Sequence, residues 1–161
     1  MFDILKRKKT IDIFSPVDGD IIPLDDVEDE VFSQKMLGDG VAVKPSKGVI
    51  VSPCNGKVIQ VFPRKHAIGI KTKEGIELLI HIGLDTVELK GEGFEQLINE
   101  GEEVKIGDRL LNVDLDLIKN KKKSIITPIV ITNMDIIDNF NSYTGNVKKG
   151  EGRIMTIKVK K

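Results

Sequence analysis

Short runs rich in valine and isoleucine, separated by glycine, proline and aspartate turn signals, fill most of the chain after residue 10. Branched side chains favour strands because they pack well on a pleated surface, while Asp-Gly and Asn-Gly supply the positive φ of tight turns. Strands at this spacing predict an all-β fold, an antiparallel β-sandwich or barrel-like jelly-roll variant with a few short helical turns. The runs span residues 11–14, 21–24, 40–44, 48–52, 57–62, 66–71, 76–82, 109–113, 125–131 and 153–159.

Helix is a minor component of this prediction. Phe94, Leu97 and Ile98 follow an i, i+3, i+4 spacing, which predicts one or two helical turns before Gly101. Residues 115–119 and 134–139 are each long enough for a further turn.

The sequence repeats one turn motif. SPVDGDI at residues 15–21 returns as SPCNGKV at residues 52–58. In both copies proline restricts the approach and Asp-Gly or Asn-Gly supplies positive φ before a strand. We therefore predict two similar β-motifs, with Cys54 as a small, half-buried apolar residue rather than a reactive thiol.

Length and composition limit the function classes. With 161 residues, the chain fits a single domain at residues 11–161 after a flexible basic tail at residues 1–10. The tail, MFDILKRKKT, either touches an anionic membrane surface or is a frayed terminus. The equal numbers of basic and acidic residues, 25 each, do not favour nucleic acid as a partner. We expect a cytoplasmic protein, because there is no secretory pattern, no apolar run of about 20 residues and only one cysteine.

Both histidines of the chain lie at the ends of one predicted hairpin, HAIGIKTKEGIELLIHI at residues 66–82. With a two-residue loop at 73–74, His66 lies directly opposite His81. A type I turn followed by a bulge at Gly75 shifts the register by one residue and puts the histidines on opposite faces.

We predict the first register, because it gives His66, Ile68 and Ile70 a face in common with Leu79 and His81. Each histidine taken alone is as well explained as a surface or core residue. As a pair, they suit nucleophilic chemistry: one neutral imidazole attacks near pH 7, and the other donates a hydrogen bond to the developing oxyanion.

A charged, glycine-rich loop follows His81 and places Asp85 four residues beyond it. The carboxylate of Asp85 either orients an imidazole and sets the local field or caps an Asx-turn.

The segment LLIHIGLDTVELKGEGF closely resembles the active-site signature of the glucose-type IIA components of the bacterial phosphoenolpyruvate-dependent sugar phosphotransferase system. Further similarity lies in SPVDGDIIPL, VFSQKMLGDGVAVKP, VFPRKHAIGI, GEEVKIGDRLLNVDL and TPIVITNMD. The resemblance implies a β-sandwich in which His81 is phosphorylated on Nε2 and His66 stabilises the phosphoryl group. It implies phospho-HPr as donor and a cysteine of a membrane-associated, sugar-specific IIB domain as acceptor.

The same resemblance implies a partner-docking face around the histidines. Its predicted members are the apolar residues Val31, Phe32, Met36, Leu37, Ile68, Leu79 and Val87 and the rim carboxylates Asp29 and Asp85. Phe62 also matches such a position, although it is the residue most expected in the core. Arg64 stands where many family members have threonine, so it either approaches the phosphate or points into solvent.

Three other functions compete with the phosphocarrier. Biotinyl and lipoyl carriers share the paired turns, but the chain has no lysine set on a suitable hairpin tip. A zinc peptidase needs a His-x-His pair, which is absent. A phosphorylation-switched regulator of metabolic enzymes or permeases, with the same fold, remains the alternative. No cofactor is expected, and the chain alone is not expected to close a metal site; at a partner interface, His66 and His81 could hold zinc with a partner carboxylate.

Overall fold

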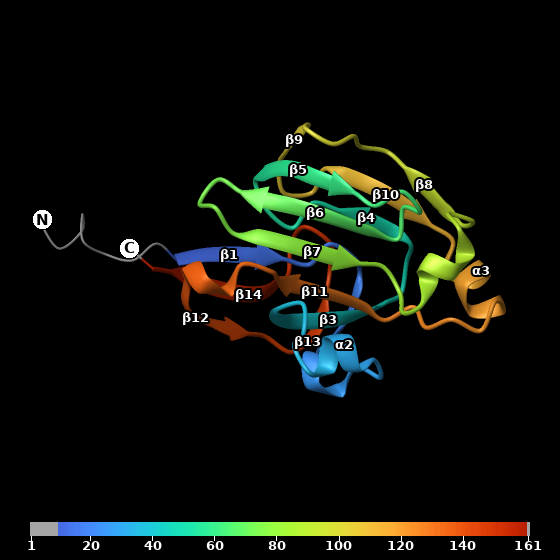
Figure 1. Ribbon diagram of the computed structural model, residues 1–161, viewed down its shortest axis with the longest axis horizontal. Helices are drawn as coiled ribbons and strands as arrows, with labels where there is room; N and C mark the ends of the chain where they lie inside the picture. The colour runs from blue at the N-terminus through green and yellow to red at the C-terminus, as the bar shows by residue number, and fades with distance from the viewer. Residues whose placement is uncertain (1–9, 161) are drawn as a thin grey trace, which may run out of the picture.

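The computed structural model describes residues 10–160, which form three antiparallel sheets (Figure 1). The largest has eight strands in the order β13-β2-β3-β11-β7-β6-β5-β9, and two three-stranded sheets have the orders β1-β14-β12 and β4-β10-β8. The strands are β1 (Thr10–Phe14), β2 (Gly19–Pro23), β3 (Asp39–Pro45), β4 (Val49–Val51), β5 (Gly56–Val61), β6 (Ala67–Thr72), β7 (Glu77–His81), β8 (Phe94–Gln96), β9 (Glu103–Val104), β10 (Arg109–Val113), β11 (Thr127–Ile131), β12 (Ile137–Ser142), β13 (Gly145–Val147) and β14 (Arg153–Val159).

The helical elements are short. They are the α-helices α2 (Glu30–Ser33) and α3 (Leu115–Asn120) and the 3-10 turns η1 (Leu24–Asp26), η2 (Thr86–Leu89) and η3 (Met134–Ile136). Each α-helix begins after an aspartate whose carboxylate accepts a backbone N–H from the first turn: Asp29 from Val31 at 2.9 Å and Asp114 from Leu117 at 3.0 Å. Within residues 10–160, no helix has the length and hydrophobicity needed to cross a bilayer.

The β-sandwich prediction is confirmed, and each of the ten predicted runs overlaps one strand, whereas β8, β9, β12 and β13 lie outside them. The helix at residues 115–119 is also confirmed, as α3. The helical turn predicted from Phe94, Leu97 and Ile98 is wrong, because Phe94 begins β8, which pairs with β10. Leu97 is 40% exposed whereas Phe94 and Ile98 are buried, so the three side chains do not form one helical face.

The repeated turn motif is confirmed as two equivalent structures. Ser15 Oγ donates to the Val17 carbonyl at 2.6 Å, and Ser52 Oγ donates to the Cys54 carbonyl at 2.7 Å. The strands that follow, β2 and β5, each pair with the next strand on one side and with a later short strand on the other. The eight-stranded sheet thus consists of two four-stranded halves, β13-β2-β3-β11 and β7-β6-β5-β9, joined where β11 pairs with β7.

Glycine is required after both turns, but not for the predicted reason, because neither Gly19 nor Gly56 adopts a positive φ. An added Cβ at Gly19 would lie 2.1 Å from the Lys44 carbonyl oxygen, and one at Gly56 would lie 2.1 Å from that of Lys71. These contacts are far inside van der Waals distance, so neither glycine tolerates a side chain without a backbone shift.

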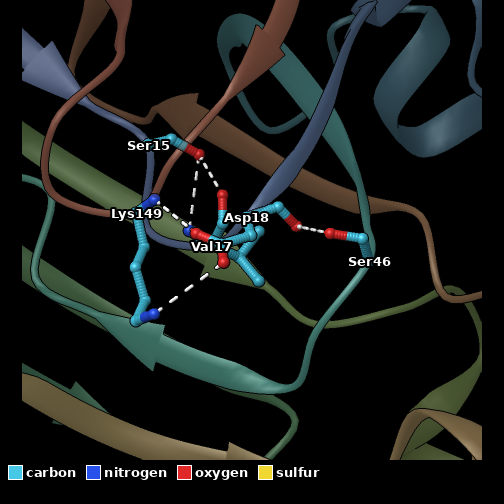
Figure 2. A network of polar contacts seen from close by, with 5 residues as sticks. All are labelled: Ser15, Val17, Asp18, Ser46 and Lys149. Atoms are coloured by element: carbon cyan, nitrogen blue, oxygen red, sulfur yellow. Dashed lines mark hydrogen bonds and ion pairs between the residues drawn. The ribbon is translucent and has the colours of Figure 1, made fainter.

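Asp18, in the first turn, anchors a distant segment of the chain (Figure 2). Its carboxylate accepts the Lys149 backbone N–H at 2.7 Å and lies 3.8 Å from the Lys149 ammonium, while its carbonyl accepts from Ser46 Oγ at 3.2 Å. The Lys149 backbone hydrogen bond is the main cause that lowers the pKa of Asp18. In the second turn Asn55 takes the equivalent place, accepting from the backbone N–H of Ile106 at 3.0 Å.

The main core lies between the sheets and is built from isoleucine, valine and leucine side chains of both halves. Cys54 belongs to this core with 2% exposure, and burial raises the pKa of its thiol to about 12. The thiol therefore stays protonated and inert, as the sequence predicts, although it is fully rather than half buried.

Candidate functional site

The β6–β7 hairpin carries both histidines at its open end, in a register that differs from the predicted one. Ala67, not His66, pairs with His81. The predicted direct opposition of the histidines is therefore wrong, and the alternative register with a bulge at the turn is found. Gly75 determines this outcome, because it adopts a φ of 97° and its N–H bonds to the Thr72 carbonyl at 3.0 Å.

The two imidazoles nevertheless meet. Their ring centroids lie 5.1 Å apart with an interplanar angle of 79°. His66 stands one residue before β6, directly after Lys65, which adopts a left-handed φ of 63°. Because His66 precedes the strand, the strict alternation of faces does not apply to it. The edge-on ring of Phe62, at a centroid distance of 5.6 Å, packs against His66 from the other end of the same turn.

A backbone carbonyl fixes the ring of His81. His81 Nδ1 lies 2.7 Å from the carbonyl oxygen of Gly83. Since a carbonyl only accepts hydrogen bonds, Nδ1 carries the proton and donates. The neutral ring therefore keeps its free lone pair on Nε2, which makes Nε2 the nucleophilic atom.

His66 is oriented by packing rather than by a protein hydrogen bond on its buried nitrogen. It is 7% exposed, and its buried Nδ1 has no hydrogen-bond partner among the described residues. A buried acceptor without a partner is less costly than a buried N–H without one. We therefore place the ring proton on Nε2, the nitrogen that remains available to an incoming group.

Both histidines are held in the neutral form. Burial lowers the pKa of His66 to about 4, and the charge of a protonated His81 acts in the same direction. Burial also lowers the pKa of His81, opposed by the Gly83 carbonyl and by the carboxylates of Asp29 and Asp85. At neutral pH the site thus contains two uncharged imidazoles with acidic groups nearby.

A small second core holds the segment that covers His81. Phe32, on α2, packs its ring against His81 at a centroid distance of 5.1 Å. The ring of Phe32 is itself fixed in a cluster with Leu24 and Val27 from its own segment and with side chains from the outer face of the large sheet. This segment connects β2 with β3, so each half of the sheet contributes one connection to the site.

The predicted docking residues divide into exposed and buried ones. Val31, Met36, Leu37 and Val87 account for four of the six large apolar side chains that are exposed among the described residues, at 38%, 69%, 43% and 40%. Leu79 is half-buried, and so is the carboxylate-bearing Asp29, whereas Asp85 is exposed.

Ile68 and Phe32 do not belong to the exposed face. Ile68 is fully buried in the main core, because the shifted register turns it to the inner side of β6 together with Ile80. The prediction that Ile68 docks a partner is therefore corrected. Phe32 is 3% exposed, so it supports the His81 ring from below the surface instead of offering contact area.

One feature near the histidines was not predicted from the sequence: Gly83 orients His81 through its carbonyl, which no side-chain pattern reveals. Of the two roles predicted for Asp85, the structure favours the local field, because its charge raises the pKa of His81 and its side chain makes no capping hydrogen bond to η2. Arg64 is exposed, but its guanidinium is held by a hydrogen bond to the Val87 carbonyl at 3.0 Å instead of pointing freely into solvent, and its approach to a phosphate stays a prediction. Arg64 thus ties the His66 turn to η2 along the rim of the site.

No cluster of three or more histidine, cysteine, aspartate or glutamate side chains within residues 10–160 could hold a metal ion. Zinc bound by His66 and His81 together with a partner carboxylate stays a prediction.

Comparison with known proteins shows which family this chain resembles. The model of a family described as the phosphoenolpyruvate-dependent sugar phosphotransferase system, EIIA 1, matches residues 11–137. The chain is 48% identical over 151 residues to the glucose-specific EIIA component of the PTS system of Staphylococcus aureus, covering 93% of this chain and 91% of that protein. Its similarity to the protein of the same name from Halalkalibacterium halodurans is 49% over 148 residues, 91% of this chain and 86% of that one. The solved structure of glucose permease IIA from Mycoplasma capricolum matches with a TM-score of 0.84 and 44% identity, covering 91% of this chain and 96% of that one.

Proposed function

Because the chain belongs to the EIIA 1 family of the phosphoenolpyruvate-dependent sugar phosphotransferase system, whose members carry phosphoryl groups in sugar uptake, we propose that His81 is its phosphoryl acceptor. The donor is phospho-HPr, and the acceptor of the second transfer is a cysteine of a sugar-specific IIB domain. The observation that carries this assignment is the 2.7 Å contact between His81 Nδ1 and the Gly83 carbonyl, which leaves Nε2 as the free nucleophile.

The first step exchanges one phosphorus–nitrogen bond for another. The lone pair on His81 Nε2 attacks phosphorus, and the bond to the donor histidine of HPr breaks with its electron pair returning to that ring. The proton on His81 Nδ1 stays in place, held by the Gly83 carbonyl. In the second step a cysteine thiolate of IIB attacks phosphorus, and the electron pair of the breaking bond returns to Nε2.

We assign a supporting role to His66. Its ring lies 5.1 Å from that of His81, and its lowered pKa keeps it neutral, so it donates one hydrogen bond from Nε2 to a phosphoryl oxygen. A donor aimed at the oxygens where charge builds up stabilises the transition state more than the ground state. The exposed side chains of Val31, Met36, Leu37 and Val87 form the docking face that both partners use in turn.

Intact mass measured after incubation with phosphoenolpyruvate, enzyme I and HPr tests the proposal. We expect one added phosphoryl group at neutral pH that acid removes, as for phosphohistidine. His81→Ala should not be phosphorylated. His66→Gln should still accept from HPr but should deliver to IIB slowly or not at all.

The converse pattern, phosphorylation of His81→Ala but not of His66→Gln, would reverse the two roles. No mass shift of the unaltered protein with an HPr of verified activity would reject the carrier function and favour the regulatory alternative.

A further inference from the structure

A basic hollow lies along the β6-β5-β9 edge of the large sheet. Figure 1 shows these strands at the top of the molecule. Its volume is about 660 Å³, within the size range of small-molecule sites. Four lysines line it, Lys57, Lys71, Lys73 and Lys105, against two carboxylates, Glu103 and Asp108. The hollow is therefore positive on balance, in a chain whose formal charge is zero.

Two of the lysines stand in an unfavourable arrangement. Lys57 on β5 is the direct cross-strand partner of Lys71 on β6. Like charges placed directly opposite each other destabilise a sheet. Each lysine also pairs with a glutamate on the neighbouring strand opposite the other lysine: Lys57 with Glu103 on β9, and Lys71 with Glu77 on β7. Of these two glutamates, Glu77 does not line the hollow.

The carboxylates present do not neutralise the lysines at close range. Among residues 10–160, no carboxylate oxygen lies within 4.0 Å of the ammonium group of any of the four lysines. Asp108 is already engaged, because its carboxylate accepts the backbone N–H of Lys105 at 2.8 Å. The lysine side chains are thus available to a ligand.

The other half of the sheet shows that the fold does not require this arrangement. Asp20 on β2 takes the place equivalent to Lys57, and it faces Lys44 on β3. Asp20 also accepts a hydrogen bond from the Asn146 side chain at 2.9 Å. The same backbone therefore carries an opposite-charge pair in one half and a like-charge pair in the other.

We propose that this hollow binds a phosphate monoester of a small organic molecule. A dianionic phosphate relieves the repulsion between Lys57 and Lys71, which serve as flexible point charges. Ile59 lines the same hollow with 43% exposure and offers an apolar wall to the carbon skeleton. Lys71 lies five residues along the chain from His66, about 16 Å on an extended strand, so this site is separate from the histidines.

Titration of the ¹⁵N-labelled full chain with glucose 6-phosphate, followed by amide chemical shifts, tests the proposal. We expect saturable shifts at Lys57, Lys71, Lys73 and Lys105, and weaker ones with inorganic phosphate or glucose alone. The double variant Lys57→Gln/Lys71→Gln should bind about tenfold more weakly or worse, because it loses two charged donors. Lys44→Gln is the matched control from the other half and should keep the affinity.

Three results would overturn the inference. One is the absence of saturable shifts at these amides at millimolar ligand, and another is equal weakening by Lys44→Gln, which would indicate non-specific attraction. The third is binding to phosphatidylglycerol vesicles but not to glucose 6-phosphate, which would assign the lysines to a lipid surface. None of these readouts depends on phosphorylation of His81, so the proposed function can fail or succeed independently.

Discussion

The Gly83 carbonyl decides which nitrogen of His81 reacts, and burial decides that both imidazoles are neutral when they do so. The choice of reacting nitrogen and the neutral charge state are each determined by the surroundings of a single residue. They also connect the chemistry of the site to the stability of the fold, because a buried histidine that resists protonation favours the unfolded state in acid.

Acid should therefore destabilise the protein partly through His66. Its pKa is lowered in the folded state to about 4 from 6.5, so between these values the unfolded chain binds a proton that the folded chain does not. The stability contributed by neutral His66 is present above pH 6.5 and is lost as the pH falls toward 4. Urea unfolding at pH 7 and pH 5 should show a smaller acid loss for His66→Gln than for the unaltered protein; equal losses would contradict this.

The charge of Arg64 should lower the pKa of His66. After burial and His81, Arg64 is the third influence that lowers the pKa of His66. Arg64→Gln should raise the pKa of His66 in an NMR titration of its ring protons, while Arg64→Lys keeps the charge and should leave it closer to the original value. An identical response of both variants would mean that the hydrogen bond to Val87, not the charge, is what matters.

At the scale of elements, the two turn motifs hold the sheet to distant segments. Asp18 is 5% exposed, and its carboxylate bonds to the backbone of Lys149, 131 residues away in sequence. Asp18→Ala leaves that N–H without a partner and should cost about 1–3 kcal/mol of unfolding free energy. Asp18→Asn keeps an acceptor and should cost less.

The pH dependence separates the charge of Asp18 from its hydrogen bond. Because its folded pKa is lowered from 3.8, its ionised form stabilises the protein above that pH, and the contribution is lost as the pH falls through the folded pKa. Denaturation curves from pH 7 to pH 3 should therefore be flatter for Asp18→Asn than for the unaltered protein. Parallel curves would show that the carboxylate charge contributes nothing.

The sequence predicted where strands lie better than it predicted the register in which they pair. Runs of valine and isoleucine located the principal strands, and the repeated SPxxG motif located the two halves. The 72–75 turn, by contrast, was compatible with two registers, and only the backbone of Gly75 distinguishes them. The short strands β8, β9 and β13 carry too few residues for a periodic pattern, so they were missed. β12 was missed because only Ile137 of its six residues is buried, which leaves no apolar alternation.

For the site, the hairpin pattern made His66 and His81 candidates as a pair, although through the wrong register, and the resemblance to a family assigned their separate roles. The support for His81 could not be predicted, since it comes from the backbone of Gly83 and from Phe32, a residue 49 positions earlier in the chain. Such contacts depend on how α2 folds over the sheet, which local sequence does not encode.

At the scale of the whole molecule, the exposed apolar side chains should differ in function according to where they lie. Val87 and Leu97 are both 40% exposed, but only Val87 belongs to the segment tied to the His66 turn. Val87→Asp should raise the KM for phospho-HPr by about tenfold or more, because it places a charge in a docking face. Leu97→Asp is the control and should leave the KM unchanged; a matching rise would show that the docking face extends over β8.

The junction between β11 and β7 gives the molecule a property that neither half has alone. His66 and His81 both belong to the β7-β6-β5-β9 half, whereas Phe32 comes from the β2–β3 connection of the other half and packs against His81 across that junction. The protein should therefore accept a phosphoryl group only when both halves are folded, so phosphorylation reports on their cooperative folding. As denaturant is added, phosphorylation should disappear together with the amide protection of both halves, and a fragment that contains only one half should never acquire it.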